Sequence, residues 1–175
     1  MTEPQGDPTN RPPLTALAVI GNGIMGHGIA QVFAVAGTRV ILIGRSESSL
    51  ATALTRIRTS LDDFIRHHLL TAEQADAALA RITTTTTLQT AAGAQLVIEA
   101  VTEDLALKRN LFAQLDAICP PQTVLASSSG QPASALNHDV THKHRVIATH
   151  FWYPPQLIPL VEVCGGPLCS PDILT

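Results

Sequence analysis

The chain has few charged side chains, few aromatic ones and few cysteines. Charged residues make up 14% of its 175 residues and aromatic residues 3%, and the three cysteines are Cys119, Cys164 and Cys169. So little charge beside 45% hydrophobic content excludes a disordered chain or a coiled coil. An odd number of widely spaced cysteines is no disulfide framework and is typical of a protein from the reducing cytoplasm.

No strong charge of one sign and no long apolar run is present either. The formal net charge is -3 and the isoelectric point about 6.1, so neither nucleic acid nor a membrane surface is expected as a partner. No run reaches the length of a membrane span, and the N-terminus lacks the apolar core of a signal peptide. Residues 1–13, polar and rich in proline, are expected to be a disordered leader before one domain over 14–175.

Short apolar runs alternate along the chain with segments of helical spacing. Strands are expected at 14–20, 39–43, 82–86, 96–100, 123–126, 146–149 and 158–163, and helices at 24–36, 47–70, 71–80, 105–118 and 132–136. The threonine-rich run at 82–86 is expected to be an edge strand. This alternation predicts an α/β fold with a mainly parallel, doubly wound sheet and helices on both faces.

A glycine-rich turn follows the first predicted strand directly and opens the first predicted helix. It has the pattern G-x-G-x-x-G and consists of Gly21, Asn22, Gly23, Ile24, Met25 and Gly26. In a βαβ unit these glycines permit the tight turn, the approach of a pyrophosphate to the backbone, and close packing of helix on strand. The helix N-terminus adds unpaired N–H groups. The motif in this context predicts a Rossmann-type dinucleotide site and is less consistent with a turn that binds nothing.

The second predicted strand lacks the acid that usually binds the adenosine ribose at its end. The chain has Gly44, Arg45 and Ser46 there instead. A carboxylate repels a 2′-phosphate, whereas an arginine followed by a serine can bind one. The residues therefore allow NADP(H), with Arg45 on the 2′-phosphate. In the alternative, Arg45 stacks on the adenine and NAD(H) binds.

A histidine and a glutamate stand on the last two predicted strands. His150 ends one strand, Glu162 lies in the next, and a proline-containing reversal separates them. If the strands are neighbours, the carboxylate can hold one imidazole nitrogen and raise the basicity of the other. This arrangement suits a base that takes a hydroxyl proton while a hydride leaves the same carbon. By spacing alone, such pairs are more often incidental.

Four segments together resemble the 3-hydroxyacyl-CoA dehydrogenase family. They are Gly21–Ala30, Val97–Glu103, His150–Pro155 and Leu160–Val163, and they follow the family's order and spacing. The resemblance implies an NAD(H)-dependent oxidoreductase of fatty acid metabolism that acts on the C3 hydroxyl of a 3-hydroxyacyl thioester. Its substrate could be an acyl-CoA, an acyl-carrier-protein or a small hydroxy acid.

The resemblance also implies roles for particular residues. His150 falls on the family's catalytic histidine and Glu162 on its partner. Glu103 and Lys108 fall on cofactor-contacting positions of the family. Without the resemblance, these two residues would indicate only the solvated start of an ordinary helix. The substrate serine falls on Ser129 when counted back from the histidine, which we prefer, and on Gly130 when counted forward from the preceding strand.

Three departures from the family bear on substrate and assembly. Ser60 matches a coenzyme A-contacting serine, but His67 stands where a basic residue is expected, and Tyr153 where asparagine is usual. The family's C-terminal helical domain is absent from these 175 residues, so the chain is expected to be either part of a longer protein or a lone domain that can pair with a helical partner domain or form a homodimer. The alternative to an enzyme is therefore a non-catalytic or partner-dependent NAD(P)-binding module.

No metal site is expected. His138, His142 and His144 are close in sequence, but a predicted loop between a helix and a strand is more often a place for solvated histidines than for metal ligands.

Overall fold

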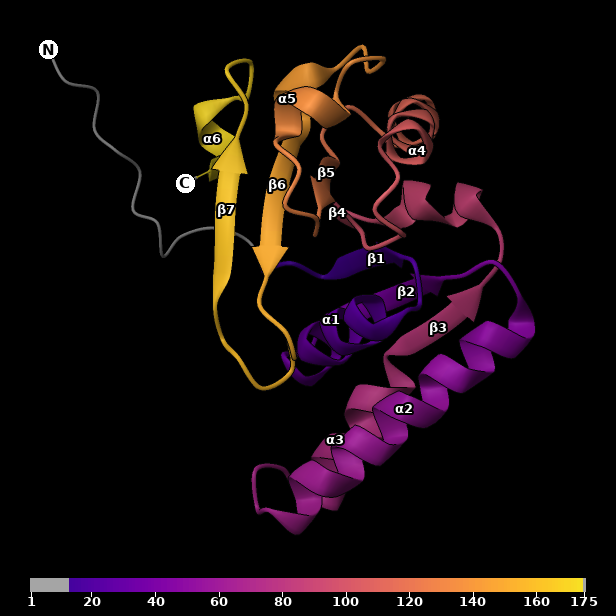
Figure 1. Ribbon diagram of the computed structural model, residues 1–175. Coiled ribbons are helices and arrows are strands. Elements are labelled where there is room, and N and C mark those ends of the chain that lie inside the picture. The colour runs from indigo at the N-terminus through magenta and orange to yellow at the C-terminus, as the bar shows by residue number, and fades with distance from the viewer. Residues whose placement is uncertain (1–12, 175) are drawn as a thin grey trace, which may run out of the picture.

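Seven strands form one sheet in the order β3-β2-β1-β4-β5-β6-β7 in the computed structural model, which describes residues 13–174 (Figure 1). The predicted leader, residues 1–13, lies outside the described residues except for residue 13. The elements are β1 (Ala16–Ile20), α1 (Ile24–Val35), β2 (Arg39–Ile43), α2 (Glu47–Arg66), α3 (Ala72–Ala80), β3 (Ile82–Thr85), η2 (Leu88–Gly93), β4 (Leu96–Glu99), α4 (Leu105–Ile118), β5 (Val124–Ser127), α5 (Ala133–Leu136), η3 (Lys143–Arg145), β6 (Val146–Phe151), β7 (Val161–Gly165) and α6 (Pro171–Leu174).

The sheet is parallel except at one end. Every pair of neighbours from β3 to β6 is parallel, and β7 runs antiparallel to β6. The strand order reverses between β1 and β4, and in such sheets ligands bind in the crevice at the carboxyl ends of the strands on either side of that point. The predicted Rossmann-type fold is confirmed, as is the edge position of β3.

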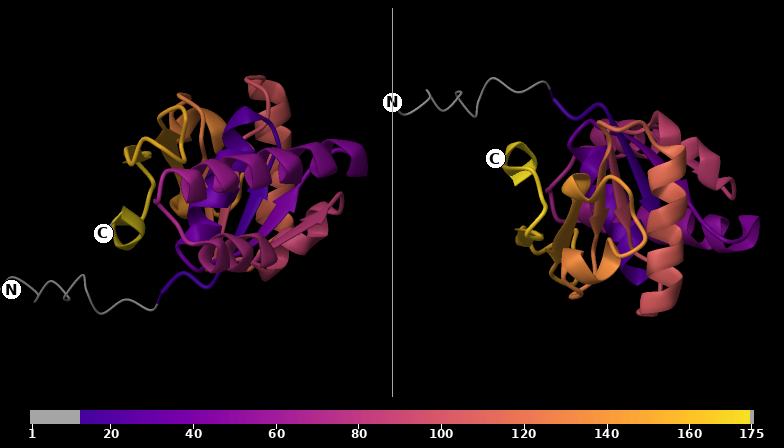
Figure 2. Two further views of the ribbon diagram at one scale, coloured as in Figure 1. Left: turned by 90° about the horizontal axis from the view of Figure 1, so that it is seen from below. Right: turned by 90° about the horizontal axis from the view of Figure 1, so that it is seen from above.

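Two apolar cores lie on opposite faces of the sheet. Alternate residues of β1 divide between them, with Leu17 and Val19 in the core under α1, α2 and α3, and Ala18 and Ile20 in the core under α4 and α5. Seen from below, α2 lies in front of the strands, and seen from above, α4 does (Figure 2). The parallel strands are therefore buried on both faces and keep only their carboxyl ends open.

Side-chain caps begin helices α2 and α3. The Ser46 hydroxyl accepts a hydrogen bond from the Ser49 amide at the start of α2. At the start of α3, Thr71 accepts from the Gln74 amide while the Gln74 side chain accepts from the Thr71 amide. Such caps satisfy N–H groups that the first turn of a helix leaves without an intrahelical partner.

Two predicted boundaries are wrong by three residues or more, and the others lie within two residues of the observed ends. The second helix ends at Arg66 rather than at 70, because His68 takes a positive φ of 58° that no α-helix continues through. The last strand begins at Val161 rather than at 158. The amides of Leu157 and Ile158 both donate to the Pro154 carbonyl, which makes that segment a turn, and Pro159 has no N–H for the sheet.

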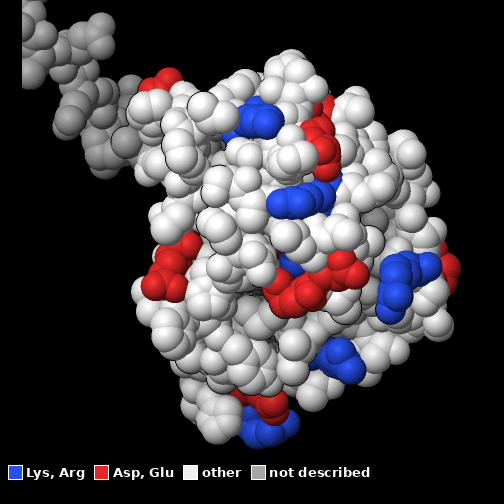
Figure 3. Space-filling view, turned by 45° about the horizontal axis from the view of Figure 1, so that its top comes forward, with Lys and Arg blue, Asp and Glu red and all other residues white. Residues whose placement is uncertain are grey.

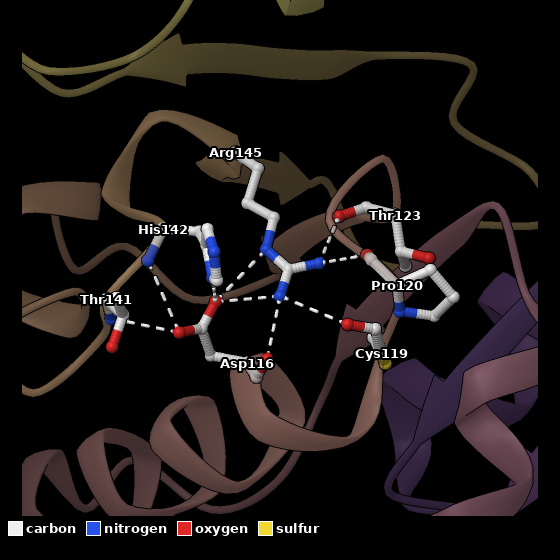
Figure 4. A network of polar contacts seen from close by, with 7 residues as sticks. All are labelled: Asp116, Cys119, Pro120, Thr123, Thr141, His142 and Arg145. Carbon is white, nitrogen blue, oxygen red and sulfur yellow. Dashed lines mark hydrogen bonds and ion pairs between the residues drawn. The ribbon is translucent and has the colours of Figure 1, made fainter.

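A buried arginine joins the end of α4 to the loop before β6 (Figure 4). The Arg145 guanidinium donates to Asp116 Oδ1 at 2.7 Å and to the backbone carbonyls of Asp116, Cys119, Pro120 and Thr123. Asp116 also accepts from the amides of Thr141 and His142. Arg145 directly precedes β6, the strand that carries His150, so this network holds the start of that strand.

The described residues include no membrane span, and the face drawn in Figure 3 shows no large patch of one charge. No helix between residues 13 and 174 is long and apolar enough to cross a bilayer. Lys and Arg alternate with Asp and Glu over the face drawn in Figure 3. Across the same residues, no group of three or more His, Cys, Asp or Glu side chains could hold a metal ion.

Candidate active site

His150 and Glu162 stand opposite each other on β6 and β7, as the spacing predicted for neighbouring strands. His150 Nδ1 lies 2.7 Å from Glu162 Oε2, and the two side chains are 44% and 55% exposed. A carboxylate can only accept, so Nδ1 donates its proton and Nε2 keeps a lone pair. The Trp152 ring lies 6.0 Å from the imidazole, centroid to centroid. The arrangement leaves a solvent-accessible base at the carboxyl edge of the sheet.

The glycine turn between β1 and α1 is shaped by close backbone approaches at its two ends. Gly21 has a φ of +101°, and a Cβ there would lie 2.4 Å from the Ala100 carbonyl oxygen. A Cβ on Gly26 would lie 1.8 Å from the Gly21 carbonyl oxygen. Both positions therefore require glycine for the fold itself, in agreement with the first and third roles of the motif.

The middle glycine is different, because nothing lies near it. A Cβ on Gly23 would meet no atom within 4 Å. The amides of the first turn of α1, at Ile24, Met25 and Gly26, have no intrahelical partner, as in any helix. The N-cap residue Gly23 has no side chain that could accept from them. An open backbone surface with free N–H groups at the positive end of a helix can hold a pyrophosphate.

A buried carboxylate connects the two loops beside the glycine turn. Glu99 ends β4 with no exposed surface, and its Oε1 accepts from Lys108 Nζ at 2.6 Å and from the Val101 amide at 2.7 Å. Its Oε2 accepts from the Ser127 hydroxyl at 2.6 Å, which in turn accepts from the Ser129 amide at 3.2 Å. One side chain therefore joins the loops after β4 and β5 to helix α4.

Lys108 does not belong to a solvated helix start, so that interpretation is wrong. Its side chain is 1% exposed and contacts Glu103 Oε1 at 3.6 Å besides Glu99, while Glu103 is 61% exposed. Glu103 can meet a ligand directly, whereas Lys108 is placed to hold the two carboxylates. A cofactor contact for either residue remains a prediction.

Glu99 and Ser127 were missed in the sequence. Glu99 is the one charged residue in the apolar strand Leu96–Glu99. A carboxylate at a position that is otherwise core must be paired, and this signal could have identified it.

Ser129 lies in the loop after β5 and is 3% exposed. Its hydroxyl oxygen accepts from the Gln131 amide at 3.1 Å, which leaves the hydroxyl proton free to donate. Gly130 is exposed and a Cβ on it would meet no atom within 4 Å. Ser129 is therefore the better of the two candidates for a polar contact with substrate, and that role remains a prediction.

A cavity of about 640 Å³ opens between α2 and the turn after β6. Ser60 and His67 both line it, together with Arg56, His27 and Gln156. The two residues at the family's coenzyme A positions are thus brought to one cavity, and Arg56 supplies a cation there.

Arg45 lies in the corner between β2 and α2. Its side chain is exposed and makes no hydrogen bond or ion pair with any residue of the described range. The predicted cofactor-binding segments, the glycine turn, Arg45 and the loop that carries Glu103, all follow strands at the carboxyl edge of the sheet.

Comparison with known proteins identifies the fold and the family of these residues. Residues 16–175 match the model of the family described as 3-hydroxyacyl-CoA dehydrogenase, NAD binding domain. The 3-hydroxyadipyl-CoA dehydrogenase of Escherichia coli is 37% identical over 159 residues, which are 90% of this chain and 34% of that protein. The 3-hydroxybutyryl-CoA dehydrogenase of Mycobacterium tuberculosis is 38% identical over 149 residues, 84% of this chain and 52% of that protein.

Solved structures agree with this result. The crystal structure of 3-hydroxybutyryl-CoA dehydrogenase from Escherichia coli superposes with a TM-score of 0.90 at 36% identity, and covers 93% of this chain and 34% of its own. The chain therefore spans between about one third and one half of the length of these relatives.

Proposed function

Because the chain belongs to the 3-hydroxyacyl-CoA dehydrogenase family, of which it carries the NAD-binding domain, we propose that it transfers hydride between the C3 hydroxyl of a 3-hydroxyacyl thioester and NAD(H). The observation that carries this proposal is the 2.7 Å contact of His150 Nδ1 with Glu162 Oε2. It gives an oriented base on a strand that ends at the same sheet edge as the glycine turn.

The residues of the glycine turn fit a dinucleotide. The open backbone at Gly23 and the uncapped start of α1 support a pyrophosphate over Gly21–Gly26. Glu103 is exposed beyond the end of β4 and is available to the nicotinamide half of the cofactor. The buried Lys108 Nζ lies 3.6 Å from Glu103 Oε1 and holds that carboxylate in place. We assign the cofactor contacts to these residues.

The chemistry follows from the tautomer of His150. NAD⁺ supplies the hydride acceptor when it is bound. His150 Nε2 takes the proton of the C3 hydroxyl while the electron pair of the C3–H bond departs with the hydride, and the C–O bond becomes a carbonyl. Glu162 stabilises the imidazolium that forms, and in the reverse direction His150 returns the proton. Ser129 donates a hydrogen bond from its hydroxyl to the substrate oxygen and keeps its proton.

For the substrate we propose a coenzyme A thioester. The relatives named above act on 3-hydroxyadipyl-CoA and 3-hydroxybutyryl-CoA, by name. The cavity beside α2 brings Ser60, His67 and Arg56 together, and these can bind the phosphates of such a carrier. An acyl-carrier-protein or a free hydroxy acid is the alternative, and Tyr153, 59% exposed beside this region, leaves room for a different acyl group.

A second candidate function is that of a nucleotide-binding module that needs a partner for catalysis. The observation in its favour is the exposure of β7 and its approach, where Leu160, Val161 and Val163 are 49%, 38% and 51% exposed. Large apolar side chains exposed on an edge strand and beside it are typical of an interaction site. We propose that a helical domain or a second copy of the chain covers it and closes the site over the substrate.

We further propose that the protein works in a reducing compartment such as the cytoplasm. All three cysteines are free, and Cys119 is buried. Burial raises the pKa of the Cys119 thiol above its ordinary value, which keeps it protonated and unreactive.

The test combines binding with turnover. The purified chain is titrated with NADH by fluorescence and then assayed for NADH-dependent reduction of acetoacetyl-CoA to 3-hydroxybutyryl-CoA. Binding with turnover supports the enzyme, and binding without turnover supports the module. A chain that does not bind NADH contradicts both.

A further inference from the structure

The corner between β2 and α2 is built around a glycine where a ribose-binding acid is usual. A Cβ on Gly44 would lie 2.8 Å from Leu50 Cδ2 and 2.9 Å from Asn22 Oδ1. Leu50 is 1% exposed and belongs to the core under α2, so it cannot simply move aside. Any side chain at this position, an aspartate included, would therefore require Leu50 and Asn22 to shift.

The residue after this glycine is a cation without a partner. Arg45 is exposed and forms no ion pair or hydrogen bond within the described residues, whereas Arg58 and Arg145 each hold a carboxylate. Two serines follow Arg45 closely in the sequence, and Ser46 Oγ and Ser48 Oγ lie 3.1 Å apart at the start of α2. The acid in the same turn is Glu47, which is exposed on the first residue of the helix.

The corner also lies against the proposed pyrophosphate site. Asn22 belongs to the glycine turn and its side chain reaches Gly44, while the Gly21 amide donates to the Ile43 carbonyl at 2.9 Å. A dinucleotide held by the turn would therefore present its adenosine ribose to the end of β2, as in folds of this topology.

From these contacts we propose that Arg45, with the hydroxyls of Ser46 and Ser48, forms a subsite for the 2′-phosphate of a nucleotide. The chain then binds NADP(H) at least as tightly as NAD(H). The guanidinium pairs with phosphate through two N–H groups, the serine hydroxyls donate to it, and no carboxylate at position 44 repels it. This inference rests on the proposed function, because it uses the same nucleotide site.

The first test compares ligands that differ only in the 2′-phosphate. The purified chain is titrated calorimetrically with 5′-AMP and 2′,5′-ADP, and by fluorescence with NADH and NADPH. We expect 2′,5′-ADP to bind about tenfold more tightly than 5′-AMP, as one charge-assisted contact provides. Tighter binding of NADH than of NADPH overturns the inference and leaves the proposed function in place. Failure to bind either dinucleotide overturns both.

Substitution of Arg45 tests the residue itself. Arg45→Ala is expected to lower the affinity for NADPH about tenfold and to change the affinity for NADH by less than about twofold. Equal weakening of the two overturns the inference and indicates that Arg45 stacks on the adenine. The matched control is Arg39→Ala, which removes an exposed arginine from the opposite end of β2 and should alter neither affinity.

Two substitutions of Gly44 separate charge from packing. Gly44→Ala and Gly44→Asp introduce the same Cβ contacts with Leu50 and Asn22, and their thermal unfolding is measured first. Relative to the alanine variant, the aspartate variant should have a lower affinity for NADPH and a higher affinity for NADH. If the two variants show the same ratio of NADPH to NADH affinity, the missing carboxylate does not determine cofactor choice and the inference is wrong.

Discussion

Lys108 Nζ lies 2.6 Å from Glu99 Oε1, and neither side chain is more than 1% exposed. The pair joins the end of β4 to the first turns of α4, directly beneath the exposed Glu103. Burial of an ion pair contributes little net stability, but loss of one partner leaves an uncompensated charge in the interior. The carboxylate also holds the Val101 amide and the Ser127 hydroxyl, so it sets the geometry of two loops at the proposed site.

Glu99→Gln should therefore be strongly destabilising. We expect it to lower the free energy of unfolding by about 3–5 kcal/mol, since Lys108 loses its buried counter-charge. Denaturant unfolding measures the change. Glu103→Gln is the matched control, because Glu103 is 61% exposed and 3.6 Å from the same Nζ. Its effect should stay under about 1 kcal/mol. Equal effects of the two substitutions would contradict a structural role for the buried pair.

Gly23→Ala should affect ligand binding and not the fold. A Cβ at position 23 meets no atom within 4 Å, so the free energy of unfolding should change by less than about 1 kcal/mol. The methyl group would stand where a pyrophosphate must approach the backbone, so NADH affinity should fall at least about tenfold. Gly93→Ala, equally uncrowded but distant from the turn, is the control. An unchanged NADH affinity in Gly23→Ala would contradict the proposed pyrophosphate site at the glycine turn.

The Asp116–Arg145 pair predicts a stability that depends on acid pH. Burial raises the pKa of Asp116, but hydrogen bonds from Arg145 and from the 141–142 segment lower it by more, so the pKa lies below its ordinary value. A depressed carboxyl pKa contributes stability above its unfolded value of about 3.9 and loses it as the pH falls through the folded value.

Asp116→Asn should therefore lower the free energy of unfolding by about 3 kcal/mol at neutral pH, since it removes the carboxylate from a buried arginine. The difference in the free energy of unfolding between this variant and the unchanged protein should become smaller as the pH falls below about 4. Denaturant unfolding over a pH series measures it, with Asp139→Asn, an exposed carboxylate paired with His138, as the control. A difference that is the same at every pH would show that the charge of Asp116 is not the cause.

Glu162→Gln should lower the turnover number more than it changes binding. An amide can still accept a hydrogen bond from His150 Nδ1, but it does not stabilise the imidazolium. We expect kcat for acetoacetyl-CoA reduction to fall about 10- to 100-fold, the usual cost of losing an orienting carboxylate, with NADH affinity unchanged. Steady-state kinetics and NADH titration measure the two quantities. A fall in affinity with unchanged kcat would place Glu162 in the binding site instead.

The sequence was sufficient where local chemistry decides the structure. The alternation of apolar runs predicted the doubly wound sheet, and the positions of His150 and Glu162 on consecutive predicted strands allowed the two side chains to meet. Each of these depends on residues close together in the chain.

The buried cluster of Glu99, Lys108 and Ser127 could not be predicted in the same way. Its members come from β4, α4 and β5, and they meet only because the strand order makes β4 and β5 neighbours. The position of Lys108 near the start of a predicted helix had suggested that it is solvated. Similarly, the contact of Gly44 with Leu50 depends on how α2 packs on the sheet, which no local pattern indicates.

The proposed reaction depends most directly on the imidazole of His150, and one kinetic comparison tests it. NADH-dependent reduction of acetoacetyl-CoA is measured for the unchanged chain, His150→Ala and His138→Ala, with the NADH affinity of each determined separately. His138 is the matched control, since its Nδ1 also lies 2.7 Å from a carboxylate, that of Asp139, on an exposed loop. We predict a 10²- to 10⁴-fold loss of kcat, roughly the contribution of a general base, in His150→Ala alone, with NADH affinity unchanged in all three. Equal rates in His150→Ala and the unchanged chain would contradict the account.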